Sequence, residues 1–119
     1  MSRQVQDAYI VAATRTPVGK APRGLLKNYR SDDLLVHVIR AALAQVPNLD
    51  PKLIEDAIIG CAMPEGDQGM NVARIGALLS GLPDTVGGVT VNRFCASGIT
   101  AIQMAADRIR VGEADVMIA

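Results

Sequence analysis

Two spacings of apolar residues divide the chain into short and long elements. Four short runs rich in apolar or β-branched residues have the length of β-strands, and they cover residues 7–13, 57–64, 88–92 and 114–119. Three longer stretches repeat apolar residues three and four positions apart, as helices do, and they cover residues 31–46, 72–81 and 97–111. Strands that alternate with helices predict an α/β fold with a parallel sheet. Strands in such a sheet are covered on both faces, so apolar runs without strict alternation are expected.

Residues at the element ends support this division. Ser31 is expected to cap the first helix, and Pro47 is expected to end it. In the stretch 49–56, Asp50 stands before Pro51, as a cap does before the first position of a helical turn. These three boundaries therefore carry residue types that suit a helix start or a helix end.

Composition narrows the functional class. The chain has 119 residues, half of them hydrophobic, which fits one domain with a sizeable core. It carries 12 basic and 12 acidic residues and no basic block, which argues against a nucleic-acid-binding surface. No apolar run approaches the roughly 20 residues of a membrane span. We therefore expect a cytoplasmic protein without a membrane span and without a nucleic-acid partner.

The candidate chemistry lies in a cysteine between a strand and a helix. Cys95 stands where the run 88–92 ends and the helical stretch from about residue 97 begins. The unpaired N–H groups and the dipole of a helix start favour a thiolate there, and the carboxyl ends of parallel strands form the usual binding crevice. A second interpretation stays open at this point, because cysteine is more often a small buried hydrophobic residue.

The other candidate residues give weaker indications. Cys61 falls inside the apolar run 57–64, so we interpret it as a buried strand residue with a free thiol. His37 is the single histidine and lies in the middle of the first predicted helix, where we expect no catalytic role. No cluster of residues has the spacing of a metal site, and we expect none.

Three separated segments resemble the thiolases, the acetyl-CoA C-acyltransferases. They read IVAATRTPVGK, GCAMPEGDQGMNVARIGALLSGLP and VTVNRFCASGITAIQMAADRIRVGEADVMIA, in that order along the chain. The resemblance implies that residues 1–119 are a partial N-terminal domain. Its fold would be the first part of the βαβαβαβ half of a five-layered αβαβα architecture.

The resemblance also implies a reaction. Cys95 would be the nucleophile that forms an acyl thioester during thiolytic cleavage of 3-ketoacyl-CoA, as in fatty-acid β-oxidation. Coenzyme A would be a substrate, and no separate cofactor is implied. The family's catalytic histidine and second catalytic cysteine have no counterpart among these residues, so we expect the chain alone to be inactive.

Three partners and two other functions remain open under this resemblance. The expected partners are acyl-CoA or CoA, further copies in a homodimer or tetramer, or a complementing chain that carries the missing half. One alternative function is that of a biosynthetic acetoacetyl-CoA thiolase or another condensing enzyme. The other is a non-catalytic split subunit or remnant that dimerises.

Overall fold

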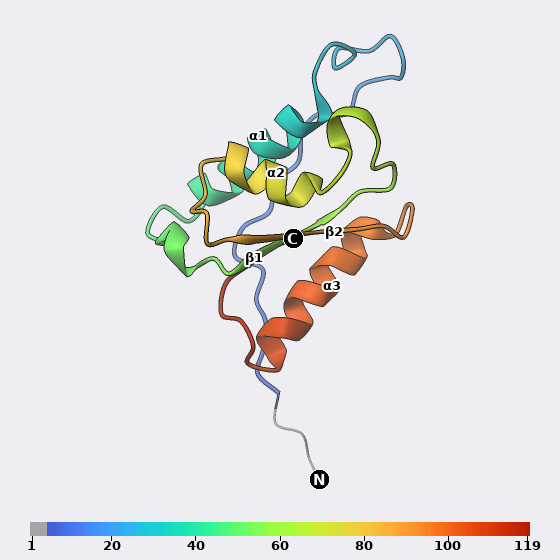
Figure 1. Ribbon diagram of the computed structural model, residues 1–119. Helices are drawn as coiled ribbons and strands as arrows, with labels where there is room; N and C mark the ends of the chain where they lie inside the picture. Colours follow the sequence, from blue (N-terminus) through green and yellow to red (C-terminus); the bar gives the residue numbers. More distant parts are fainter. Residues whose placement is uncertain (1–4) are drawn as a thin grey trace.

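The computed structural model describes residues 5–119 and places a three-stranded parallel sheet between helices on both faces (Figure 1). In chain order the elements are α1 (Ser31–Ala44), the 3₁₀ helix η1 (Pro51–Leu53), β1 (Asp56–Gly60), the 3₁₀ helix η2 (Gly66–Gln68), α2 (Val72–Leu79), β2 (Gly87–Val91), α3 (Ser97–Arg110) and β3 (Met117–Ile118). The predicted α/β class with a parallel sheet is confirmed.

The sheet is built around β1, which pairs with β2 on one side and β3 on the other. Asp56 stands opposite both Gly87 and Met117 in the two registers. Neighbouring residues of a strand point to opposite faces, and the two buried residues of β1 show this directly. Ala57 packs into the core beneath α1 and α2, whereas Ile58 packs against α3. One strand therefore supports both layers.

Among the elements of residues 5–119, α3 is the helix that covers one face of the sheet, and α1 and α2 lie on the other (Figure 1). The buried residues of α3 are Ser97, Ala101 and Ala105, which recur at every fourth position and so lie on one side of the helix. Because these side chains are small, the helix backbone approaches the sheet closely. Helices α1 and α3 are the longest among residues 5–119, with 14 residues each, and none of the helices there could cross a membrane.

The predicted helix caps have mixed outcomes. Asp50 accepts a hydrogen bond from the N–H of Lys52 at 3.0 Å, so the predicted cap of η1 is confirmed. The prediction that Ser31 caps α1 is wrong, because Ser31 is already the first helical residue. A carboxylate oxygen of Asp67 instead accepts the Ser31 N–H at 2.9 Å, and this bond lowers the pKa of Asp67. A residue after β1 thus accepts the hydrogen bond of a free N–H group at the start of α1.

The prediction of a strand over residues 7–13 is wrong. In the sheet order β2-β1-β3 the outer edges of β2 and β3 are open, but this apolar segment pairs with neither of them. It runs in an extended conformation, and Gln45 exchanges two hydrogen bonds, of 3.2 and 2.9 Å, with the backbone of Ala13. Tyr9, Ile10 and Val11 remain more than 70% exposed. The strand expected over 114–119 is confirmed only as Met117–Ile118.

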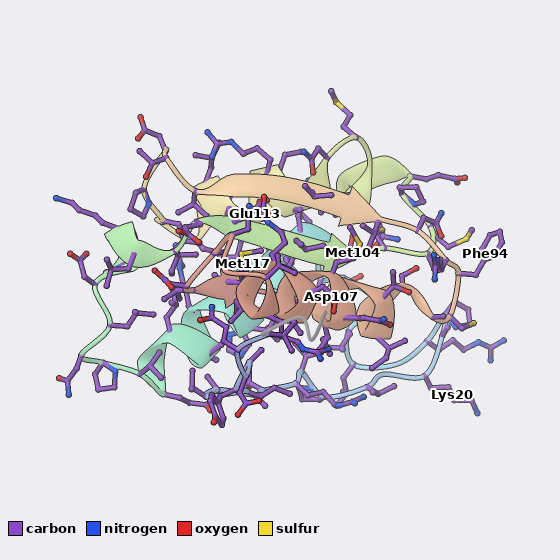
Figure 2. The ribbon with its side chains drawn as sticks, turned by 90° about the horizontal axis from the view of Figure 1, so that it is seen from below. Lys20, Phe94, Met104, Asp107, Glu113 and Met117 are labelled. Atoms are coloured by element: carbon purple, nitrogen blue, oxygen red, sulfur yellow. The ribbon has the colours of Figure 1, made fainter. Side chains whose placement is uncertain are left out.

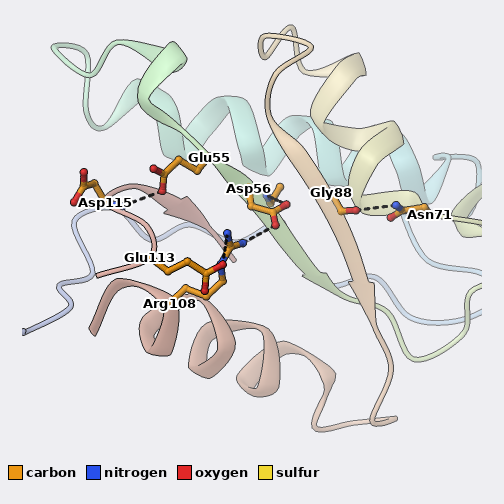
Figure 3. Close-up of polar contacts among 8 residues, drawn as sticks. Glu55, Asp56, Asn71, Gly88, Arg108, Glu113 and Asp115 are labelled. Carbon is orange, nitrogen blue, oxygen red and sulfur yellow. Dashed lines mark hydrogen bonds and ion pairs between the residues drawn. The ribbon is translucent and has the colours of Figure 1, made fainter. Parts of the chain in front are cut away.

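Polar side chains tie the amino-terminal end of the sheet to helices on both of its faces (Figure 3). The Asp56 carboxylate accepts from the Arg108 guanidinium at 2.7 Å and from the Ala57 N–H at 2.9 Å, which joins the start of β1 to the end of α3. Across the sheet, the Asn71 amide donates to the Gly88 carbonyl at 2.8 Å and so joins the start of α2 to β2. Each contact fixes a helix relative to a strand.

Candidate active site

Cys95 lies in the five-residue connection 92–96, which joins the end of β2 to the start of α3. We refer to residues 92–97 as the elbow. Cys95 is a free cysteine, and it is exposed. The elbow leaves the sheet at the carboxyl end of β2, where ligands bind in open parallel sheets. The prediction that Cys95 stands at a strand-to-helix transition is therefore confirmed.

Successive hydrogen bonds fold the elbow into a tight turn. The N–H groups of Ala96 and Ser97 donate to the carbonyls of Arg93 and Phe94 at 3.0 and 3.1 Å. The Ser97 hydroxyl donates to the Phe94 carbonyl at 2.7 Å and accepts from the Arg93 N–H at 2.8 Å. Cys95 is the one residue between these bonded groups, so its backbone is held from both sides.

The residue before Cys95 has an unusual backbone conformation. Phe94 has a φ of +49°, in the left-handed region, which costs a residue with a side chain about 1–3 kcal/mol. Asn92 compensates for this, because its side-chain oxygen accepts from the Phe94 N–H at 2.9 Å. The Phe94 ring is 74% exposed, and Figure 2 shows it projecting from the end of the molecule. Strain of this kind gathers at functional sites.

The elbow is also anchored to the loop after β1. The Asn92 amide donates to the Ala62 carbonyl at 3.3 Å, so one side chain contacts both the elbow and the neighbouring loop. Gly60, the last residue of β1, faces the start of α3, where an added Cβ would stand only 2.5–2.7 Å from backbone atoms of Ser97 and Gly98. The glycine therefore permits the end of β1 to pack closely against the start of α3, which positions the elbow relative to the sheet.

The start of α3, beside Cys95, has neither a side-chain cap nor an acidic residue. Ala96 is the N-cap of α3 and offers no side-chain hydrogen bond, and the first turn contains no acidic residue. At the opposite end, Arg108 and Arg110 suit the negative pole of the helix. No carboxylate of that first turn therefore competes with a thiolate or a substrate oxygen for the first N–H groups of α3.

The second cysteine has a different environment. Cys61 follows β1 directly and is 8% exposed, and its N–H donates to the Val91 carbonyl at 2.9 Å. Its sulfur lies 4.0 Å from the Gln68 carbonyl oxygen. The predicted burial of Cys61 is confirmed. Both cysteines follow the carboxyl ends of neighbouring parallel strands, but only Cys95 reaches the surface.

The other groups considered in the sequence do not join Cys95. His37 is exposed on α1, and α1 lies across the sheet from α3 (Figure 1). The single histidine of the chain therefore lies on a helix of the face opposite α3. Within residues 5–119, no three His, Cys, Asp or Glu side chains lie close enough to hold a metal ion.

Sequence reasoning found the thiol but missed the side chains that hold it. Asn92 and Ser97 both bond to the elbow backbone, and Gly60 contacts it from another strand. The position of Asn92 two residues before Phe94 is a usable indication, because asparagine side chains commonly bond to the backbone two residues on. Nothing local indicates the role of Gly60, since its neighbour Ser97 is far along the chain.

Comparison with known proteins agrees with this arrangement. The family model described as "Thiolase, N-terminal domain" matches residues 8–119. The chain is 44% identical over 114 residues to a 3-ketoacyl-CoA thiolase of Aeromonas hydrophila, covering 96% of this chain and 30% of the relative. It is 43% identical over 115 residues to the 3-oxoadipyl-CoA/3-oxo-5,6-dehydrosuberyl-CoA thiolase of Escherichia coli, covering 97% of this chain and 28% of the relative.

A solved structure shows the same arrangement of the backbone. The crystal structure of the Bacillus anthracis acetyl-CoA acetyltransferase superposes with a TM-score of 0.88 at 36% sequence identity, covering 98% of this chain and 29% of that one. The chain thus spans about 30% of the length of the relatives that it matches. The expected thiolase-like fold is confirmed for this portion, and the chain belongs to the thiolase family, whose N-terminal domain it matches.

Proposed function

We propose that Cys95 is the nucleophile of a thiolase-type acyl transfer. The observation that carries this proposal is an exposed thiol held at the apex of a hydrogen-bonded elbow, at the start of a helix and at the carboxyl end of a parallel strand. Thiols in this position are suited to nucleophilic catalysis. Family membership supports the same role, because the named relatives act on acyl-CoA thioesters by name.

The reaction proceeds in two exchanges. The Cys95 sulfur attacks the ketone carbon of a 3-ketoacyl-CoA, the bond between that carbon and C2 breaks, and the released carbon takes up a proton to give acetyl-CoA. The shortened acyl group remains on the sulfur as a thioester. The thiol of a second CoA then attacks this thioester, releases acyl-CoA and returns the proton to Cys95. One thioester replaces another, so the intermediate is not a deep energetic trap.

The proposal assigns only the nucleophile to these residues. A base must take the thiol proton, and donors must stabilise the oxyanion, and together these groups supply much of the rate. His37 is exposed on α1, across the sheet from α3, and we assign it no part in the reaction. We therefore propose that the remaining groups come from a complementing segment or chain, that the assembly is a homodimer or tetramer, and that the 119-residue chain alone does not turn over.

The test is single acylation by an acyl-CoA, followed by mass spectrometry of peptides containing each cysteine. The expected result is an acyl adduct on Cys95 and none on Cys61, formed faster than on a synthetic peptide of residues 89–101, which carries the same cysteine without the fold. Cys95→Ala should abolish the adduct, and the matched Cys61→Ala variant should retain it. Acylation of Cys95 no faster than that of the peptide would contradict the proposal and favour a non-catalytic role.

A second candidate is the reverse reaction, a condensation of two acetyl-CoA molecules. The observation that favours it is the similarity to a structure named acetyl-CoA acetyltransferase. Product analysis of the completed enzyme separates the two directions. Acetyl-CoA alone should give acetoacetyl-CoA in a condensing enzyme, whereas a longer 3-ketoacyl-CoA with CoA should give a shortened acyl-CoA in a degradative one of the β-oxidation type.

We also propose a cytoplasmic location, which the two free thiols support.

A further inference from the structure

Ser97 is the most deeply buried polar side chain at the elbow. It is 4% exposed, and among residues 5–119 only Asp32 is another polar or charged residue in the buried class. A buried hydroxyl must find hydrogen-bond partners, or its burial is unfavourable. Ser97 finds two, the Arg93 N–H at 2.8 Å and the Phe94 carbonyl at 2.7 Å. Its donor and one acceptor position are therefore both used.

The direction of these bonds is unusual for a serine at a helix start. Such residues commonly cap the helix by accepting from its free N–H groups. Ser97 instead bonds backward, to the two residues that precede Cys95. Its hydroxyl thus makes no capping hydrogen bond to the N–H groups of α3, and the N-cap residue Ala96 makes no side-chain bond either. The Ser97 hydroxyl therefore serves the elbow and accepts from none of the N–H groups of α3.

Two further contacts fix Ser97 itself. The backbone of Ser97 and Gly98 packs so closely on Gly60 that a Cβ there would stand 2.5–2.7 Å away, so the start of α3 cannot approach β1 further. The Ser97 N–H donates to the same Phe94 carbonyl that receives its hydroxyl, at 3.1 Å. Ser97 follows Cys95 in the chain and bonds to the two residues before it, so it links the backbone on the two sides of Cys95.

We propose that Ser97 is a positioning residue for the Cys95 nucleophile. Its hydroxyl closes the backbone ring of residues 93–97 and keeps Phe94, the residue before Cys95, in its left-handed conformation. This inference rests on the proposed function of Cys95. Ser97 does not touch the substrate; it acts through the geometry of the elbow.

The test uses the 119-residue chain and three variants. Ser97→Ala removes the hydroxyl, Ser97→Thr retains it, and Thr100→Val is the matched control. Thr100 lies one turn further along α3, and its hydroxyl donates to the Ala96 carbonyl at 2.8 Å, in a bond that leaves residues 92–95 untouched. Two quantities are measured across neutral pH: the rate of Cys95 alkylation by iodoacetamide and the hydrogen exchange of the Arg93 amide, whose acceptor is the Ser97 hydroxyl.

We expect Ser97→Ala to speed Arg93 exchange by about fivefold or more, the factor that matches the loss of one ordinary hydrogen bond. Its alkylation rate and pH profile should move toward those of the peptide of residues 89–101. Ser97→Thr should restore most of the wild-type values, and Thr100→Val should keep them. A merely structural role would lower the melting temperature without changing the pH profile of the folded chain.

Two results would overturn the role of Ser97. One is a folded Ser97→Ala variant with the wild-type alkylation rate and pH profile. The other needs no variant: an Arg93 amide in the wild-type chain that exchanges as fast as an unprotected one. If wild-type Cys95 itself reacts no differently from the peptide, the proposed function fails, and the role of Ser97 fails with it.

Discussion

Gly60 offers the sharpest test of how the sheet sets the position of the elbow. It ends β1 and faces the first turn of α3. In Gly60→Ala the new Cβ would stand 2.5 Å from the Ser97 carbonyl carbon, 2.6 Å from the Gly98 nitrogen and 2.7 Å from the Ser97 oxygen. All three are backbone atoms, which cannot rotate away as a side chain could. Either β1 or the start of α3 must move.

The expected cost follows from this overlap. Forcing one extra carbon into a close-packed site costs about 1–3 kcal/mol of unfolding free energy. For a chain of this size each kcal/mol corresponds to roughly 3–6 °C in melting temperature. Because the movement displaces Ser97, the hydrogen bonds that it makes to Arg93 and Phe94 should weaken as well. We therefore expect Gly60→Ala to lower both the stability of the chain and the reactivity of Cys95.

Gly98→Ala is the matched control. Nothing lies within 4 Å of its Cβ position, so the same change in composition meets open space. Replacing a helical glycine there should stabilise the chain by about 0.4–1 kcal/mol, because the unfolded chain loses conformational freedom. Thermal and urea unfolding, followed by circular dichroism, give both values. A Gly60→Ala variant as stable as Gly98→Ala, with wild-type Cys95 reactivity, would refute the packing described for β1 and α3.

Three further predictions concern the elements that support the site. Thr90→Val should lower the free energy of unfolding by about 1–3 kcal/mol in urea, because the fully buried Ala73 loses the hydroxyl that accepts its N–H at 3.1 Å; equal stability would contradict this. Ile58→Ala should cost about 2–5 kcal/mol in the same assay, since it leaves a cavity between β1 and α3; a loss below about 1 kcal/mol would instead indicate that α3 collapses into the vacated space. Asp67→Asn should flatten the acid dependence of stability. The Ser31 N–H lowers the folded pKa of Asp67, so its stabilisation is present above the unfolded pKa of about 4 and is lost as the pH falls through the folded pKa; an unchanged acid melting curve would oppose it.

The sequence was most informative where structure depends on neighbouring residues. Apolar spacing predicted all three helices, which the structure places at Ser31–Ala44, Val72–Leu79 and Ser97–Arg110. Asp50 before Pro51 predicted a cap that forms as expected. These features are decided within one or two helical turns, so the information lies in the local sequence.

Features that depend on distant residues were predicted poorly. The apolar run 7–13 has the composition of a strand, but whether it becomes one depends on pairing with a strand far along the chain, and it joins neither open edge of the sheet. Likewise, the partner of the Ser31 N–H is Asp67, which lies 36 residues along the chain. No local pattern identifies such a partner.

The candidate site divides in the same way. The position of Cys95 follows from a strand-to-helix transition, which the sequence shows directly. The roles of Ser97 and Gly60 depend on the direction of one hydroxyl and on the approach of two backbones, which only the folded chain reveals. The sequence therefore predicts the candidate thiol, and the structure shows which residues hold its backbone.

The most direct test of Cys95 as the nucleophile is competition between limiting iodoacetamide and an acyl-CoA on the native chain. The label on each cysteine is mapped by mass spectrometry, with the peptide of residues 89–101 as the reference for an unfolded thiol. We predict that Cys95 is labelled faster than the peptide, that Cys61 is labelled slowly, and that acyl-CoA protects Cys95. Labelling of Cys95 at the rate of the peptide, without protection by acyl-CoA, would contradict its assignment as a nucleophile.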